Sequence, residues 1–349
     1  LNALLAHPVE LGLTRPAQKS YPHVNGLYLL LRASGLTVVA GSGGKQFLLV
    51  DHAVRQQWDD LNHTERYCSL LEAWLVRGRP EIINEHRRRW PRIPETCQNV
   101  YGFFLRLPKD GLAVAGNKAA QESIRYRPGL HNLALLELFG LVTVQHGAPE
   151  SGQGWQIQRV ERKSLGEALL TVLYTGFFGD WNQLNAVEEE QGIPFGVLQP
   201  TLQPYFPSWQ KNLVIPDWAF REGTHIFKVS LQQIWRRIAI PAHLTLEDLA
   251  TAILNAVHFD HDHLYEFRYR NRYGIEEQVH HSYMDEGPWA HDVSIGEVPL
   301  HVGQSMSFLY DFGDRWEFEV GLEKVDPEWK IEEAVVLEEH GIPPMQYGW

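Results

Sequence analysis

Length, composition and charge limit the classes to which this chain can belong. It has 349 residues, 44% of them hydrophobic, and two cysteines, Cys68 and Cys97, without a CxxC spacing. That length allows two or three domains with their own cores, and so few cysteines argue against a disulfide framework. No apolar run reaches the ~18 residues of a membrane helix, and no signal peptide is recognisable. We therefore expect a cytoplasmic protein, whose first residue, Leu1, suggests a trimmed start.

The net charge of −12 is concentrated in one half of the chain. Residues 1–220 hold 21 Lys/Arg and 20 Asp/Glu, whereas residues 221–349 hold 10 and 23. An acidic half binds phosphate backbones poorly, because non-specific nucleic-acid affinity comes from cationic contacts. It suits cations or basic proteins as partners. No Walker loop, GxGxxG or nucleophile elbow is present, so we expect no nucleotide cofactor.

A helix followed by a hairpin is predicted twice in the first 175 residues. Residues 25–50 contain a helix closed by Gly35, a strand, a Gly-rich tip and a returning strand. Residues 129–161 repeat the plan with Gly140 as the helix stop. A glycine is expected there because a helix that runs straight into a strand needs a left-handed cap. We therefore predict two winged-helix-like units, at residues 1–100 and 101–178, with a coincidental αββ unit in each place as the alternative.

The segment between these repeats contains an amphipathic helix and then the basic cluster of the chain. The helix covers residues 61–75 and ends before Gly78 and Pro80. Residues 77–92 then hold six arginines and two glutamates. Their candidates for contact with phosphates are Arg87, Arg88, Arg89 and Arg92. The neighbouring Trp90 and Pro91 favour the plainer alternative, a solvated helix face followed by a packed loop.

Residues 164–178 predict another helix, and residues 179–222 form a connector. The connector holds five prolines and several aromatic residues, among them Trp209. Disordered linkers are poor in aromatic residues. We therefore expect an ordered, irregular strap before a C-terminal domain at residues 223–349.

In the C-terminal domain, apolar residues mostly recur at every second position, which is the pattern of β-strands. Residues 225–231 and 234–240 predict a hairpin, Thr245–Val257 a helix, and residues 263–269 a strand. After an excursion, residues 305–325 predict a second hairpin in which Gly313 supplies a positive φ and Phe312 shares the core face with Phe308 and Tyr310. Residues 326–349 predict a short helix and a tail. The fold class is α+β, a ββαβ-ββ and mostly antiparallel sheet with one packed helix.

These residues resemble a known family. The phrase IWRR at 234–237, the helix TLEDL, the strand HLYEF and the hairpin YDFGDRWEFE occur in that order. They resemble the plasmid pRiA4b ORF-three-like family, also described as an insertion-element passenger protein. Residues 58–75 resemble the N-terminal extension of its longer members. The chain departs from the family at Gln232 and Gln233, where Pro-Pro is frequent, and lacks its late Cys-Pro and Gly-Gly. The resemblance implies a fold and no established activity.

Histidines and carboxylates gather in the acidic half. Ten of the seventeen histidines lie beyond residue 224. His261, His263 and Asp311 have the side-chain types that ligate zinc, manganese or iron, although their spacing matches no standard motif. His263, Glu266, Asp311 and Asp314 are also the candidates for acid/base catalysis. The alternative is turn chemistry on a solvated acidic face. No cofactor is predicted, and a divalent metal is the one that the pattern allows.

Tryptophan and arginine form a second candidate site. The proposed ligand-binding residues are Trp235, Arg236, Arg237 and Trp316. Strand alternation places Arg236 and Arg237 on opposite faces. One arginine is expected to pair with Glu266 or Asp311, and an anion-binding role is the functional alternative.

Taken together, the sequence predicts a non-enzymatic binding or adaptor protein of a bacterial mobile element, with DNA or protein as the partner. A metal-dependent, hydrolase-like enzyme and a small-ligand binding module are the alternatives, so the sequence does not decide whether the protein is an enzyme. No membrane contact is expected, and the oligomeric state is open.

Overall fold

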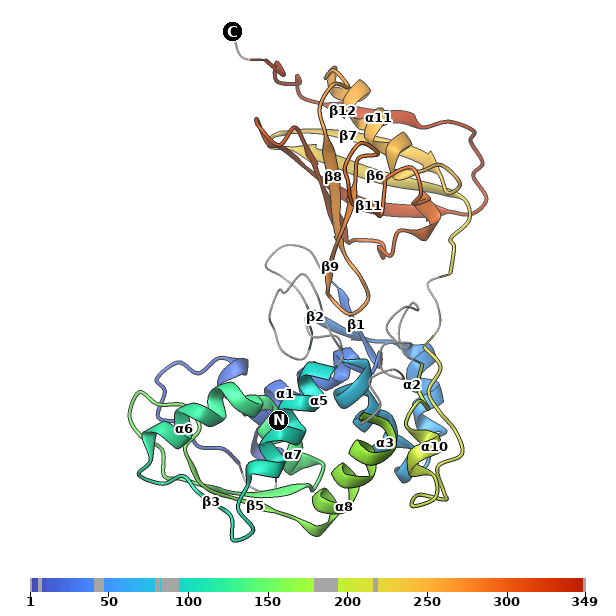
Figure 1. The fold of residues 1–349 in the computed structure, drawn as a ribbon. Helices are drawn as coiled ribbons and strands as arrows, with labels where there is room; N and C mark the ends of the chain where they lie inside the picture. The colour runs from blue at the N-terminus through green and yellow to red at the C-terminus, as the bar shows by residue number, and fades with distance from the viewer. Residues whose placement is uncertain are drawn as a thin grey trace. The chain divides into compact units, whose positions relative to one another are not determined.

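The chain divides into two compact units in the computed structural model (Figure 1). The structure describes residues 2–5, 8–40, 47–78, 82, 94–178, 194–215 and 219–347. The N-terminal unit comprises Leu1–Leu36 and Asp51–Ile215, and the C-terminal unit comprises Thr37–Val50 and Pro216–Trp349. Helices dominate the first unit and an antiparallel sheet the second, which confirms the α+β class. In the described part of the chain, no helix is long and apolar enough to cross a membrane.

The N-terminal unit combines helices with a small sheet of strand order β3-β5-β4. Its described elements are η1 (Asn2–Leu4), η2 (Gln18–Ser20), α1 (Pro22–Ala33), α2 (His52–Asp59), α3 (His63–Glu72), η3 (Ala73–Arg77), α5 (Pro94–Arg106), β3 (Leu112–Ala113), α6 (Lys118–Ile124), η4 (Arg125–Gly129), α7 (Leu130–Leu138), β4 (Val142–His146), β5 (Ile157–Arg162), α8 (Ser164–Leu173), η5 (Tyr174–Phe178) and α10 (Gln199–Leu202).

The two predicted helix-plus-hairpin segments are confirmed as elements. Helix α1 ends before Gly35 (φ +70°) and α7 before Gly140 (φ +73°), so both glycines adopt the left-handed cap that a side chain would strain. Helix α1 packs on α7. Gly26 permits this close approach, because a Cβ there would lie 3.1 Å from the Leu135 Cγ. The winged-helix assignment of these segments stays a prediction.

Helix α3 anchors the described part of the connector to the N-terminal unit. Asn62 and Glu65 form a capping box at the start of α3. Glu65 Oε1 also accepts hydrogen bonds from the N–H groups of residues 210–211. The buried Glu72 accepts those of Gly196 and Leu198, both at 2.7 Å. Burial raises the pKa of Glu72 to about 7, while these donors and a nearby arginine oppose the rise. Residues 194–215 are therefore part of the N-terminal unit.

The C-terminal unit is a seven-stranded antiparallel sheet with one long helix packed on it. The strand order is β12-β7-β6-β11-β10-β8-β9. The two predicted hairpins, the helix and the intervening strand are confirmed. The elements are β6 (Thr224–Leu231), β7 (Ile234–Pro241), α11 (Leu246–Val257), β8 (Tyr265–Arg270), β9 (Glu276–His280), η6 (Ile295–Glu297), β10 (Ser305–Tyr310), β11 (Trp316–Asp326) and β12 (Val335–His340).

Helix α11 forms where the sequence predicts it. Thr245 and Asp248 form a reciprocal capping box at its start. Its inward face buries apolar residues such as Leu249 and Ile253, which are 0% exposed and pack against strand residues such as Phe267. Each such side chain stabilises the fold by roughly 1.5–3 kcal/mol. The inward-facing side chains of the strands and of helix α11 therefore pack together in one hydrophobic core.

A short hairpin from the first segment belongs to the C-terminal unit. Strands β1 (Thr37–Ala40) and β2 (Phe47–Val50) pair with each other. The Val39 N–H donates to the Arg272 carbonyl at 3.0 Å, and Gln304 Nε2 donates to the Val39 carbonyl at 3.1 Å. The hairpin that the sequence places in residues 1–100 thus makes its hydrogen bonds within the C-terminal unit.

The prediction of a helix after residue 326 was wrong. Residues Val335–His340 form β12, which pairs with β7 at the edge of the sheet. Glu338 of β12 forms an ion pair with Arg237 of β7 at 2.5 Å. Arg237 also forms an ion pair with Glu323 of β11 at 2.6 Å. Cross-strand charge pairs of this kind stabilise the pairing of β12 with β7. The local sequence of residues 335–340 does not by itself decide between helix and strand.

The prediction for the turn around Gly313 was also wrong in its details. The positive φ angles fall on Asp311 and Arg315, both at 57°. The Gly313 N–H donates to Asp311 Oδ1 at 2.8 Å. Because the ladder between β10 and β11 ends at Tyr310, Phe312 leaves the core face and is 39% exposed.

Acid should weaken the C-terminal unit through His225. Burial, together with the charge of Arg221, lowers the pKa of this 0% exposed imidazole to about 4. The folded state then binds fewer protons than the unfolded state between pH 4 and the ordinary pKa of ~6.5. We expect this group's stabilising contribution, present above pH 6.5, to fall by about 3 kcal/mol as the pH drops to 4.

The free energy of unfolding in guanidinium chloride at pH 7, 5.5 and 4 measures this effect. His225→Phe has no titrating group, so the difference between the natural protein and the variant should change across this range. A difference that stays constant from pH 7 to pH 4 would contradict the prediction.

Candidate functional site

The structure brings part of the predicted His/Asp group together at one end of the C-terminal sheet. His263 Nε2 lies 3.6 Å from Asp311 Oδ2 and 3.5 Å from Asp262 Oδ1. The Tyr347 hydroxyl lies 3.3 Å from the same nitrogen. The Tyr310 hydroxyl donates to the Asp260 carbonyl at 2.5 Å. This end is therefore a partly exposed cluster of polar side chains.

The remaining predicted catalytic and metal residues do not join this cluster. His261 Nε2 lies 3.0 Å from Asn255 Oδ1. Glu266 is buried and forms an ion pair with Arg268. Asp314 stays exposed in its turn. His261, His263 and Asp311 therefore do not converge as three ligands of one ion.

Arg236 and Arg237 have structural partners that the sequence did not predict. Arg236 is 2% exposed and donates hydrogen bonds to the Ala256 and His340 carbonyls, each at 2.9 Å. It also reaches the Gly341 carbonyl at 3.3 Å. Arg237 pairs with glutamates of β11 and β12. The expected pairing with Glu266 or Asp311 was wrong, because β7 lies beside β12 and β6 rather than beside β8 or β10.

Trp235 and Trp316 do not share a surface. In the register, Trp235 lies opposite Ser230, and Ser230 lies opposite Glu319. Glu319 is an odd number of residues from Trp316, so the two indoles lie on opposite faces of the sheet. Trp235 stacks on His340 at 5.6 Å, whereas Trp316 packs edge-on against Phe259 at 5.0 Å. The predicted aromatic ligand surface is therefore not formed.

The nucleic-acid candidates Arg87, Arg88, Arg89 and Arg92 lie outside the described residues. Among the described residues, helices α1 and α7 precede the two hairpins and would be the groove-reading helices of winged-helix units. Both are largely buried, and their exposed large hydrophobic residues are Leu31 and Leu138. A recognition helix needs an exposed polar face to reach base edges in a DNA groove. Helices α1 and α7 therefore offer no such face.

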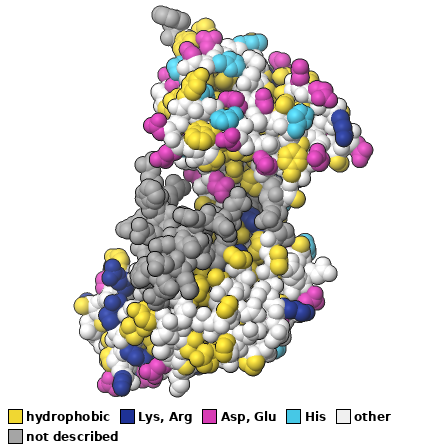
Figure 2. All heavy atoms as spheres, turned by 45° about the vertical axis from the view of Figure 1, so that its right-hand side comes forward, with side chains coloured by type: hydrophobic (Ala, Val, Ile, Leu, Met, Phe, Trp, Pro, Cys, Tyr) yellow, Lys and Arg dark blue, Asp and Glu magenta, His cyan; other side chains and the backbone are white. Residues whose placement is uncertain are grey.

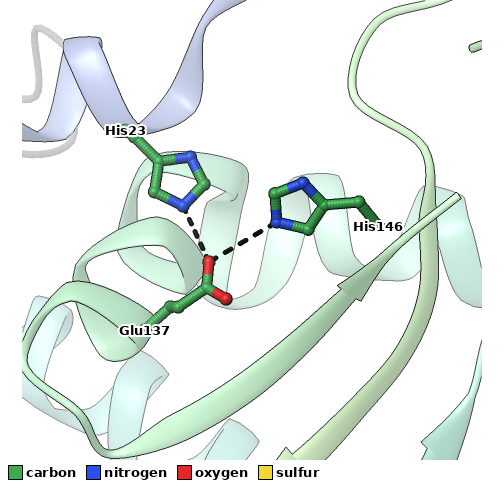
Figure 3. A group of neighbouring side chains, drawn as sticks. All are labelled: His23, Glu137 and His146. Atoms are coloured by element: carbon green, nitrogen blue, oxygen red, sulfur yellow. Dashed lines mark hydrogen bonds and ion pairs between the residues drawn. The ribbon is translucent and has the colours of Figure 1, made fainter. Parts of the chain in front are cut away.

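Sequence reasoning missed a group in the N-terminal unit that consists of His23, Glu137 and His146 (Figure 3). Glu137 Oε2 lies 2.8 Å from His23 Nε2 and 3.8 Å from His146 Nε2. The Val144 N–H donates to the other carboxylate oxygen at 3.2 Å. Burial raises the pKa of Glu137, but hydrogen bonds and charge from the two histidines outweigh burial and bring it to about 2. This carboxylate is therefore ionised.

No spacing in the sequence reveals this group. His23 lies at the start of α1, and Glu137 and His146 lie in α7 and at the end of β4, so only the packing of α1 on α7 joins them. Among the described residues, it is the one set of three histidine, cysteine, aspartate or glutamate side chains whose ligand atoms all lie within 4.8 Å of one another.

Comparison with known proteins covers the C-terminal region. Residues 225–347 match the family model described as plasmid pRiA4b ORF-3-like protein. The resemblance read from the sequence is confirmed there. The predicted family extension at residues 58–75 lies outside the matched range and stays a prediction.

Individual relatives are each similar over about a third of the chain. An uncharacterised protein, y4hQ, of Sinorhizobium fredii is 32% identical over 119 residues, which are 33% of this chain and 59% of that protein. The chain thus spans less than two thirds of this curated relative. A crystal structure of a protein of unknown function from Methanosarcina mazei Go1 is 27% identical, with a TM-score of 0.32, and covers 34% of this chain and 70% of that one.

Replacing Arg236 with lysine should destabilise the C-terminal pRiA4b ORF-3-like region. A lysine keeps the charge but lacks the planar guanidinium, so it would leave the buried Ala256 carbonyl of α11 and the part-buried His340 carbonyl of β12 without a donor. We expect Arg236→Lys to lower the free energy of unfolding by about 3 kcal/mol.

Arg237→Lys is the matched control, because this side chain is more exposed and forms surface ion pairs worth less than about 1 kcal/mol. Denaturant unfolding of the full chain compares the two variants. Equal decreases in the free energy of unfolding for the two variants would show that the buried guanidinium of Arg236 has no special role.

Proposed function

We propose that this protein is a non-enzymatic binding or adaptor protein whose C-terminal unit accepts an extended segment of a basic partner protein along β12. The observation that carries the proposal is the edge position of β12, which is paired on one side only, by β7. Val335 and Leu337 of this strand are 44% and 39% exposed. An edge strand with exposed apolar side chains is a template for an added strand, because its outer backbone groups are ready to pair.

The other edge of the sheet offers a weaker template. The β9 residue His280 bridges to Trp289, and its backbone exchanges hydrogen bonds with Pro288 and Ala290 at 2.9 and 2.8 Å. That edge is therefore partly occupied by the chain itself. The β12 edge, together with the exposed Ile342 and Met345 that follow it, is the better platform.

Charge supports a basic partner. Residues 221–349 hold 23 Asp/Glu against 10 Lys/Arg. Asp, Glu and His side chains recur over the visible face of the C-terminal unit, whereas Lys and Arg are sparse there (Figure 2). Complementary charge steers encounter and suppresses wrong partners. The same charge disfavours contact of this unit with DNA.

The alternatives have less support from the described residues. A hydrolase built on His263 and Asp311 lacks converging metal ligands, and a small-ligand module lacks the shared surface of Trp235 and Trp316. The plasmid origin in the family's description supports, as part of this proposal, a role linked to mobile elements in the bacterial cytoplasm.

Peptide binding to the full chain tests the proposal. The probe is a labelled ten-residue peptide of alternating lysine and valine, with a glutamate–valine peptide as its counterpart. We expect fluorescence anisotropy to show binding of the basic peptide, weakened by salt. The double variant Val335→Asp and Leu337→Asp should bind about tenfold more weakly, since it loses apolar edge contacts.

Added aspartates would strengthen a purely electrostatic attraction, so weaker binding identifies the apolar edge. Val214→Asp, at an exposed position of the N-terminal unit, is the matched control and should bind as the natural protein does. Equal binding of both peptides, or unchanged binding by the double variant, would refute the proposal.

A further inference from the structure

The packing of the N-terminal unit brings two imidazoles and one carboxylate to a common point. His23 comes from the first turn of α1, Glu137 from the last turn of α7, and His146 from the end of β4. Both histidines point their Nε2 atoms toward Glu137 Oε2 (Figure 3). Gly26 lets α1 approach α7 closely, which sets His23 over the end of α7.

The group is sheltered but accessible. The His23 side chain is 4% exposed, whereas those of Glu137 and His146 are 20% and 19% exposed. The buried indole of Trp155 packs edge-on against both imidazoles, with ring centroids 5.0 and 5.5 Å away. This arrangement restrains the rings and leaves one side of the group within reach of solvent.

Two buried polar atoms beside the group lack partners. The Nδ1 atom of His23 and the Nε1–H of Trp155 have no hydrogen-bond partner among the described residues. A buried polar group without a partner costs about 1–3 kcal/mol. Neither atom is a ligand in the group, because both histidines turn Nε2 toward Glu137.

The donor set selects the kind of ion. Two imidazoles and one carboxylate bind zinc in hydrolytic enzymes and iron(II) in the facial triad, whereas magnesium and calcium prefer oxygen ligands alone. The three ligand atoms lie within 4.8 Å of one another, so small side-chain movements bring them to metal–ligand distances of ~2.0–2.2 Å. Three protein ligands leave a further position for water, as in catalytic rather than structural zinc sites.

We propose that His23, Glu137 and His146 form a binding site for a divalent first-row transition metal ion, with zinc as the preferred ion. Metal binding replaces the hydrogen bond between His23 Nε2 and Glu137, and the neutral imidazole then keeps its proton on Nδ1. This site is in the N-terminal unit, and it stands or falls independently of peptide binding along β12.

Zinc binding by the full chain, prepared without a polyhistidine tag, tests the proposal. Elemental analysis and competition with a chromophoric chelator should show one zinc ion per chain and no comparable binding of magnesium. Even outer-shell changes cost 10–100-fold in affinity, so His146→Ala should weaken zinc binding by about 100-fold or more. Glu137→Gln keeps the shape of the side chain and should also weaken it strongly.

Two control variants locate the ion. His52→Ala removes an exposed histidine of the same unit and should bind zinc as the natural protein does. His263→Ala removes the central histidine of the C-terminal cluster and should also leave zinc binding unchanged. Loss of zinc in His263→Ala with retention in His146→Ala would overturn the proposal in favour of the C-terminal cluster.

Cobalt(II) substitution provides a readout that folding alone does not supply. The cobalt form should absorb visible light as a site with nitrogen and oxygen ligands does, and Glu137→Gln should lose that spectrum while its circular dichroism stays native. If the group only holds α1, α7 and β4 together, the protein should bind no stoichiometric zinc and show no cobalt spectrum. The absence of stoichiometric zinc, or of the cobalt spectrum, would refute the metal site.

Discussion

Buried charge that is satisfied by backbone groups is the constraint on which this structure depends. The guanidinium of Arg236 is buried between the sheet and α11, and its donors reach carbonyls at the end of α11 and of β12. A buried cation is tolerated only when its hydrogen bonds are complete. One side chain therefore joins the end of the helix to the end of the last strand. In the N-terminal unit, the buried Glu72 carboxyl holds the returning connector by accepting hydrogen bonds from two backbone N–H groups.

Local patterns predicted most elements, because their information is local. The helix at Thr245 has its capping box and apolar period within thirteen residues, and Gly35 and Gly140 mark helix ends that require a left-handed residue. Strand β12 was missed because its stabilising partners are on β7, about a hundred residues earlier in the chain. The turn after Tyr310 was predicted wrongly, because the residues with positive φ depend on where the pairing of β10 with β11 ends. The sequence of the turn alone does not specify that position.

The candidate sites show the same division between local and tertiary information. The sequence drew attention to His263 and Asp311 because histidines and acids are dense there, and the structure places those two side chains close together. The clustering of histidines and acids in the sequence did not bring His261, Glu266 or Asp314 to the same point. His23, Glu137 and His146 are not clustered in the sequence at all. It exists only because α1 packs on α7.

Burial distinguishes the two histidine groups in chemical terms. At the C-terminal cluster, His263 is 34% exposed and Asp262 is 61% exposed, so water can satisfy each charge and screen their attraction. In the N-terminal unit, His23 is 4% exposed and faces an ionised carboxylate that two histidines and a backbone N–H hold. Desolvation there makes any uncompensated charge costly, and the groups that compensate Glu137 come from two other elements, α1 and β4. A fold that gathers three ligands and shelters them from bulk water lowers the cost of assembling a cation site, which is why the buried group is the stronger metal candidate.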